Sequence, residues 1–259
     1  MSAVLDLDIE SQLEDEAGTA VARRVPPVQL ALLRGFELRC DGRPIQLPLS
    51  AQRLLAFLAL QQRVVHRLFV AGSLWIEASE ERANANLRSA LWRLRRPGHP
   101  LIDVTVTHVG LAANVVVDIR QAEARARRFL SQPDGWKADP YELLLSGDLL
   151  PDWYEDWVLV ERERFRQLRL HALESICESL TAEGKFGQAV EAGLTAVSAE
   201  PLRESAQRSL VRAFLAEGNR AEALRQYRHC RRLLHEELGV KPSPEMEELI
   251  KGLGPEHAA

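Results

Sequence analysis

The segment between residues 80 and 96 carries the side chains best suited to contact a charged partner. It reads EERANANLRSALWRLRR. Successive residues of a helix lie about 100° apart, so an apolar stripe on one side leaves a polar face opposite it. That face and its flanks hold six candidate contact residues: Arg82, Arg88, Ser89, Trp92, Arg93 and Arg96. Arginine side chains can fork onto guanine edges or phosphate oxygens, so the segment is a candidate DNA-contacting helix.

Two alternatives stay open for this face. Its arginines can simply solvate an ordinary surface helix, because surface arginine clusters are common. Trp92 can pack on a sugar or a thymine methyl group, or it can anchor the helix against a neighbouring hairpin. The surrounding elements therefore decide how much weight DNA contact receives.

Histidine and cysteine, the other chemically capable residues, show no catalytic or metal-binding pattern. The seven histidines show no pairing at metal-ligand spacing, and Cys40, Cys177 and Cys230 lie far apart with no CxxC. The sequence has no Walker-type glycine-rich loop and no GxSxG. We therefore predict no enzyme activity, no catalytic residue, no metal site and no cofactor. The odd, sparse cysteine count favours a reducing compartment.

Local signals predict the elements around the candidate helix. Ser79 is a suitable N-cap, Glu80 and Glu81 favour the first turn, and Pro97-Gly98 stops the helix. Upstream, the strands VQLALL and FELRC lead through an Asp-Gly turn to a third strand, RPIQLPL. Two helices follow, one capped by Ser50 and one from about residue 66 to 75.

Two further strand-like runs, LIDVTV and LAANVVVD, follow the candidate helix. We expect a turn between them around His108 to Gly110, with Thr107 and His108 as additional DNA contacts. Strands, three helices and a terminal hairpin in this order describe a winged helix-turn-helix domain, which we place at residues 26–118.

The pattern after Asp118 is helical almost to the end. LTAEGKFGQAV (180–190) and FLAEGNRAEAL (214–224) match at an offset of about 34 residues, the tetratricopeptide period. The glycines of the two motifs end helices, and their alanines let helices approach closely. We therefore expect a mostly α protein with an all-α, tetratricopeptide-like repeat domain at 119–254 and a flexible C-terminus at 255–259. The expected helices are 157–182, 185–198, 203–217, 220–237 and 244–252.

Charge is distributed unevenly along the chain. Residues 1–25 hold six acids against two arginines, and we expect a disordered acidic tail there, with a fluctuating helix as the alternative. Residues 28–118 hold eleven arginines against seven acids, although the formal net charge of the chain is −4. A local basic excess permits a phosphate-binding face. Without a basic leader or a long apolar run, we expect a cytoplasmic protein with no membrane partner.

The tract GDLLPDWYEDWVLVERERFRQLRL is the densest aromatic region. Aromatic residues where a loop enters a long helix usually lock that helix onto its neighbours. The alternative is a surface for a second subunit or for polymerase. The sequence alone leaves both interpretations of Trp153, Tyr154 and Trp157 open.

Residues 28–251 resemble the Streptomyces antibiotic regulatory protein family, in which a winged helix is joined to a bacterial transcriptional activator domain. The likeness depends on LRGFELRCDGRPIQLP, RVVHRLFVAGSLW, ANANLRSALWRLRR and VGLAANVVVD, and on two more specific tracts, LLPDWYEDWVLVERERFRQLRLHALE and EALRQYRHCRRLLHEELGVKPSPEME. The chain departs from the family at the turn THVGLA, which lacks the usual wing arginine, and at Leu68 and Phe69, which replace commonly polar residues.

The resemblance implies a transcriptional activator, often of a secondary-metabolite gene cluster. Such a protein binds direct repeats in double-stranded DNA as a homo-oligomer and recruits RNA polymerase. It implies that the helix 80–96 enters the major groove and that residues 101–117 form the wing. The alternative function is a protein-interaction scaffold whose helical repeats bind a partner, with a weak or vestigial DNA-binding domain; the neutral wing is its best support. A repressor also remains possible.

Overall fold

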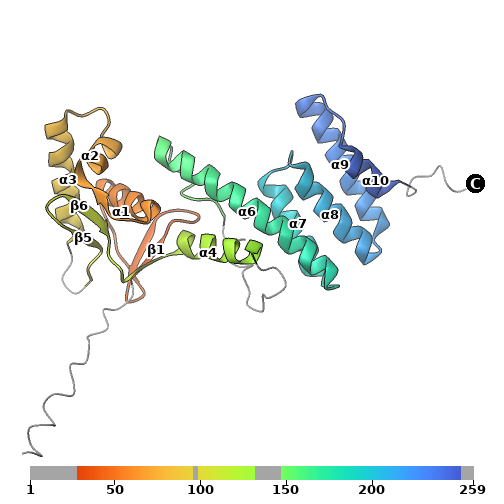
Figure 1. The fold of residues 1–259 in the computed structure, drawn as a ribbon, viewed down its shortest axis with the longest axis horizontal. Helices are drawn as coiled ribbons and strands as arrows, with labels where there is room; N and C mark the ends of the chain where they lie inside the picture. The colour runs from red at the N-terminus through yellow and green to blue at the C-terminus, as the bar shows by residue number, and fades with distance from the viewer. Residues whose placement is uncertain (1–27, 96–98, 132–146, 252–259) are drawn as a thin grey trace, which may run out of the picture.

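The structure, a computed structural model, describes residues 28–95, 99–131 and 147–251. The acidic segment 1–25, Arg96, the helix stop at 97–98 and the C-terminal segment 255–259 lie outside the described residues, so those predictions stay untested. The elements with a winged-helix order lie at one end of the molecule, and the stacked helices extend away from them (Figure 1).

A small sheet opens the described chain. Its strands are β1 (Val28–Ala31), β2 (Glu37–Cys40), β3 (Arg43–Pro44) and β7 (Val115–Val117), in the spatial order β3-β2-β1-β7. The predicted Asp-Gly turn is confirmed, since Asp41 and Gly42 both have positive φ. The third strand is shorter than expected, because Pro44 and Pro48 have no amide hydrogen for the ladder.

Three helices follow the first strands. They are α1 (Leu49–Gln61), α2 (Arg67–Leu74) and α3 (Glu80–Leu94), with the short strand β4 (Val65–His66) between the first two. The prediction that Ser50 caps α1 is wrong. The N-cap is Pro48, whose carbonyl accepts hydrogen bonds from the amides of Ala51 and Gln52. Proline fits here because an N-cap needs extended backbone and an accepting carbonyl rather than its own amide.

The wing is the hairpin of β5 (Ile102–Val104) and β6 (His108–Leu111), extended by β4 into a sheet of order β4-β6-β5. The predicted turn at His108 to Gly110 is wrong, because these residues belong to β6. The turn lies at residues 105–107, where the Thr105 amide donates to the His108 carbonyl. The predicted hairpin end at residue 117 is also wrong, since β7 leaves the hairpin and pairs in parallel with β1.

The remaining helices are α4 (Asp118–Ser131), α6 (Asp156–Ala182), α7 (Phe186–Ala199), α8 (Glu204–Glu217), α9 (Arg220–Leu238) and α10 (Pro244–Ile250). The repeat prediction is confirmed at its marker residues. Gly184 and Gly218 have positive φ at the ends of α6 and α8, and Ala189 and Ala223 are fully buried. Glycine is favoured in the left-handed conformation that ends a helix, and alanine allows close helix packing.

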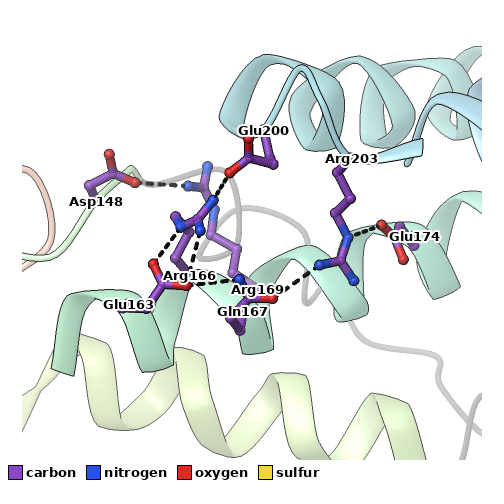
Figure 2. A network of polar contacts seen from close by, with 8 residues as sticks. All are labelled: Asp148, Glu163, Arg166, Gln167, Arg169, Glu174, Glu200 and Arg203. Atoms are coloured by element: carbon purple, nitrogen blue, oxygen red, sulfur yellow. Dashed lines mark hydrogen bonds and ion pairs between the residues drawn. The ribbon is translucent and has the colours of Figure 1, made fainter. Parts of the chain in front are cut away.

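Polar contacts as well as apolar packing hold the repeat helices together (Figure 2). Arg203, just before α8, reaches back to α6, where it contacts Glu174 at 2.5 Å and Gln167 at 3.0 Å. Arg166 of α6 binds Glu163 on its own helix and Glu200 after α7. These contacts fix α6 against the α7–α8 connection.

The aromatic tract lies where the two parts of the molecule meet. Trp153 stacks on Phe36 with ring centroids 6.1 Å apart, and Trp157 meets Phe57 of α1 edge-on at 5.3 Å. Both tryptophans pack against the hydrophobic core of the winged-helix region. The interpretation as a structural lock is therefore confirmed for them, whereas Tyr154 is exposed.

A partly buried carboxylate joins the start of α4 to the residues that follow β1. Asp118 accepts hydrogen bonds from the backbone amides of Leu32 and Leu33 at 2.9 and 3.0 Å, although 85 or 86 residues separate them in sequence. It also accepts from the amide of Ile119. Burial raises the pKa of the Asp118 carboxyl, and these amide hydrogen bonds partly offset that rise.

Replacing Asp118 by alanine should destabilise the protein by about 2–4 kcal/mol, because the amides of Leu32 and Leu33 would lose their acceptor. Equilibrium unfolding in urea measures this loss. Asp103→Ala is the matched control, since Asp103 is exposed and its loss should change stability by less than about 0.5 kcal/mol. Equal midpoints for the two variants would contradict the assigned role of Asp118.

Candidate nucleic-acid interface

Helix α3 is built as the sequence predicts. The Ser79 hydroxyl accepts a hydrogen bond from the Arg82 amide at 3.4 Å, and Glu80 and Glu81 lie in the first turn. The buried residues of α3 are the predicted apolar stripe: Ala83, Leu87, Ala90, Leu91 and Leu94. The helix ends at Leu94, and Arg95 continues in extended backbone as the C-cap, earlier than residue 96. The buried stripe orients the opposite face outward.

The predicted contact residues of α3 that the structure describes are all exposed: Arg82, Arg88, Ser89, Trp92 and Arg93. Arg96, the sixth, lies outside the described residues. Trp92 is 74% exposed, so it does not anchor α3 against the wing. A large aromatic ring that stays in solvent on a polar helix face is free to contact a partner.

The arginines of this face differ in how they are held. The Arg93 guanidinium donates to the Ser50 hydroxyl at 3.0 Å, which joins the end of α3 to the start of α1. Arg82 and Arg88 line a shallow hollow with Ser79, Glu81 and Asn84. No carboxylate among the described residues forms an ion pair with Arg82 or Arg88, so both guanidinium groups remain available to an anion.

Thr107 and His108, the predicted wing contacts, lie side by side at the end of the wing turn and are exposed. The Thr107 hydroxyl and His108 Nδ1 are 2.9 Å apart. The His108 ring also meets His66 of β4 edge-on, with centroids 5.2 Å apart. The structure thus brings both residues together at the wing turn, with a second imidazole beside them.

Arg67 is a candidate contact residue that sequence reasoning missed. Its backbone amide donates to the Thr107 carbonyl at 2.8 Å, and its guanidinium lies 3.5 Å from the Val106 carbonyl. The wing turn has no arginine of its own, but Arg67 places a cation beside it. The pairing of β4 with β6 places Arg67 there, and no local pattern in the sequence indicates that pairing.

The described residues contain no cluster of side chains typical of a metal site. Within residues 28–95, 99–131 and 147–251, no three His, Cys, Asp or Glu side chains cluster in a way that could hold a metal ion. Burial raises the pKa of the Cys177 and Cys230 thiols to about 11, which opposes any role as a nucleophile at neutral pH. In the same ranges, no helix has both the length and the apolar character needed to cross a bilayer.

Comparison with known proteins assigns the family. Residues 118–253 match the family described as bacterial transcriptional activator domain. The chain is 30% identical to the regulatory protein AfsR of Streptomyces griseus over 234 residues, which cover 83% of this chain and 23% of the relative. It is also 30% identical to AfsR of Streptomyces coelicolor over 249 residues, which cover 91% of this chain and 24% of that protein. The chain thus spans about a quarter of the length of these relatives.

The fold has a solved counterpart. It matches Mycobacterium tuberculosis EmbR, solved in complex with a low-affinity phosphopeptide, with a TM-score of 0.72 at 19% identity; the match covers 88% of this chain and 65% of that one. The fold and the exposed face of α3 define a winged-helix protein that continues into helical repeats. The chain belongs to the bacterial transcriptional activator domain family. Both AfsR relatives are named as regulatory proteins, not as enzymes.

The buried thiols allow a direct test of whether the folded protein has an activated cysteine. With pKa values near 11, Cys177 and Cys230 should be about one part in a thousand thiolate at pH 8. Cys40 is buried as well. We expect the folded protein to react with Ellman's reagent at least about 100-fold more slowly than the protein in guanidinium chloride, where all three thiols should titrate. Rapid stoichiometric reaction of the folded protein would show an accessible, activated cysteine.

Proposed function

We propose that this regulator binds double-stranded DNA by inserting α3 into the major groove while the wing contacts the adjacent backbone. The main support is the exposed α3 face, on which Arg88, Ser89 and Trp92 project from a helix whose apolar stripe is fully used in packing. Arg82 and Arg93 flank this face, and Thr107, His108 and Arg67 provide polar and charged groups at the wing. Arg96 belongs to the proposed set on sequence grounds alone.

We further propose an activator that binds direct-repeat promoter sites as a homo-oligomer, in the cytoplasm, and that controls a secondary-metabolite gene cluster. The family assignment and the AfsR relatives support this proposal. The modest basic excess of the winged-helix segment also supports several subunits on one site, because a single weakly charged surface would bind phosphate poorly. The proposed division is a DNA-binding domain at 26–118 and a helical domain at 119–254.

RNA polymerase is the proposed partner of the activator. Leu68 and Phe69 on α2 are each about half exposed, and Ile76, in the turn between α2 and α3, is 84% exposed. Exposed apolar side chains in a soluble protein often mark a protein-binding surface. We propose this part of α2 and its following turn as the polymerase contact. The scaffold alternative was favoured by a neutral wing, and Arg67 weakens that support because it supplies a cation there.

Removing arginines from the α3 face should weaken DNA binding. We expect Arg88→Ala to reduce affinity for a specific promoter site roughly 5- to 150-fold, as one lost base or phosphate contact would. If the lost contact is to phosphate, the slope of log affinity against log salt concentration should fall by about one. Fluorescence anisotropy with labelled DNA at several salt concentrations measures both quantities.

Arg228→Ala is the matched control, since Arg228 is an exposed arginine on α9, far along the chain from α3. It should leave both affinity and salt slope unchanged. If Arg88→Ala and Arg82→Ala bind the promoter as tightly as the unmodified protein at moderate salt, α3 is not the DNA-reading helix. Retention of a protein partner without any specific DNA would instead favour the scaffold.

A further inference from the structure

Arg53 of α1 forms hydrogen bonds with α2 of the winged helix and with the helical-repeat region at the same time. Its Nε donates to Glu155 Oε1 at 2.8 Å, and its Nη2 donates to the Leu74 carbonyl at 3.0 Å. Both ion-pair side chains are about three-quarters buried. One guanidinium group thus joins two elements that lie 21 and 102 residues away from it in sequence.

The Leu74 carbonyl lies where α2 ends and the turn into α3 begins. Leu74 is the last residue of α2, and the final carbonyls of a helix have no partner within the helix. The turn that starts there, residues 75–79, leads directly into α3 and ends at its N-cap, Ser79. The Arg53 hydrogen bond therefore fixes the point from which α3 departs.

Glu155 belongs to the other part of the molecule. It is the N-cap of α6, inside the segment 118–253 that matches the activator-domain family. Its carboxylate holds the guanidinium group of Arg53 in one orientation. Because arginine donates in a rigid planar fork, fixing one arm on Glu155 directs the other arm toward Leu74.

A second, apolar route runs in parallel. Trp157 of α6 packs edge-on against Phe57 of α1. The ring of Phe57 in turn lies beside that of Phe69 of α2, with ring centroids 6.0 Å apart. Phe57 follows Arg53 by four residues, so the two side chains lie on the same side of α1. The start of α6 thus touches α1 at two residues, and each of these touches α2.

We propose that Glu155 and Trp157 are positioning residues for DNA reading: acting through Arg53 and Phe57, they set the place of α2 and of the turn that leads into α3. The start of the helical-repeat region is then part of the DNA-reading unit. This inference rests on the proposed function of α3. It makes the orientation of α3 depend on whatever changes the position of α6.

Three variants of the full chain separate this role from a simple interdomain bond. Glu155→Ala removes the ion pair, and Arg53→Lys keeps it but loses the second arm of the fork. The double exchange of Arg53→Glu with Glu155→Arg restores an ion pair, but a carboxylate at position 53 cannot donate to the Leu74 carbonyl. Glu161→Ala is the control, since Glu161 forms its ion pair with Arg164 on the same helix and, among the described residues, forms no ion pair with α1 or α2.

Affinity for the promoter site and the urea midpoint are measured for each variant. We expect Glu155→Ala, Arg53→Lys and the double exchange to lose roughly 3- to 30-fold in affinity for the specific site, with little change on random DNA. The double exchange should recover most of the urea midpoint that Glu155→Ala loses, but none of the affinity. Recovery of affinity together with the midpoint would overturn the proposal, because the pair would then serve only to join the two regions.

Hydrogen exchange without DNA tests the positioning role independently of the proposed function. Amides of residues 75–82 should exchange faster in Glu155→Ala, in Arg53→Lys and in the double exchange than in the unmodified chain and in Glu161→Ala. Unchanged exchange there would overturn the coupling even if DNA binding is confirmed. If the unmodified chain binds no specific DNA, the proposed function fails, while the exchange result still decides whether α6 positions the turn.

Discussion

The packing of Trp153 on Phe36 and of Trp157 on Phe57 of α1 is the contact on which the rest of the structure depends. The strands of the winged-helix region contain two to four residues each, so the region has little sheet of its own to cover α1. Its hydrophobic core is completed by Leu149, Leu150, Val158 and Phe165, all from the activator-domain segment. Backbone hydrogen bonding also crosses from one region to the other, since the Leu150 amide donates to the Leu32 carbonyl at 2.9 Å. The position of α3 is consequently set by a core that extends across both regions.

This arrangement changes how the electrostatics of the chain should be understood. The formal net charge of −4 would oppose DNA as a partner if charge were spread evenly. It is not spread evenly, since residues 28–118 hold eleven arginines against seven acids. Several arginines outside the α3 face are also held in structural contacts. Arg162 donates to the carbonyls of Leu149, Leu150 and Trp153, and Arg120 caps the end of α1 at Leu58 and Ala59. Arg82 and Arg88 stand apart from these, since both are exposed and line the shallow hollow at the start of α3.

Local patterns in the sequence predicted the elements whose causes are local. Ser79 caps α3, Asp41-Gly42 forms the hairpin turn, and Gly184 and Gly218 end repeat helices, because each depends on a few neighbouring residues. The prediction at Ser50 failed because Pro48, two residues earlier, offers an equally good start to α1. The helix periods also located the exposed face of α3 correctly, since burial of one stripe determines the opposite one.

Long-range pairings were not predictable from one sequence. The wing turn lies three residues before its expected place, because pairing of His66 with His108 assigns His108 to a strand. The same pairing brings Arg67 to the wing, where the sequence indicated a neutral turn. The aromatic tract was recognisable as a lock, but its partners Phe36 and Phe57 were not, and neither was the contact between Arg53 and Glu155.

Genome-wide mapping of the DNA bound by the intact chain is the most direct measurement of whether this protein reads DNA sequence through α3. The proposed function predicts enrichment of a short motif, repeated in the same orientation at about one helical turn of 10–10.5 base pairs, upstream of genes. Enrichment should weaken steeply as the salt concentration of the wash rises. Recovery of DNA without any shared motif, at every salt concentration, would contradict the assignment of α3 as a reading helix.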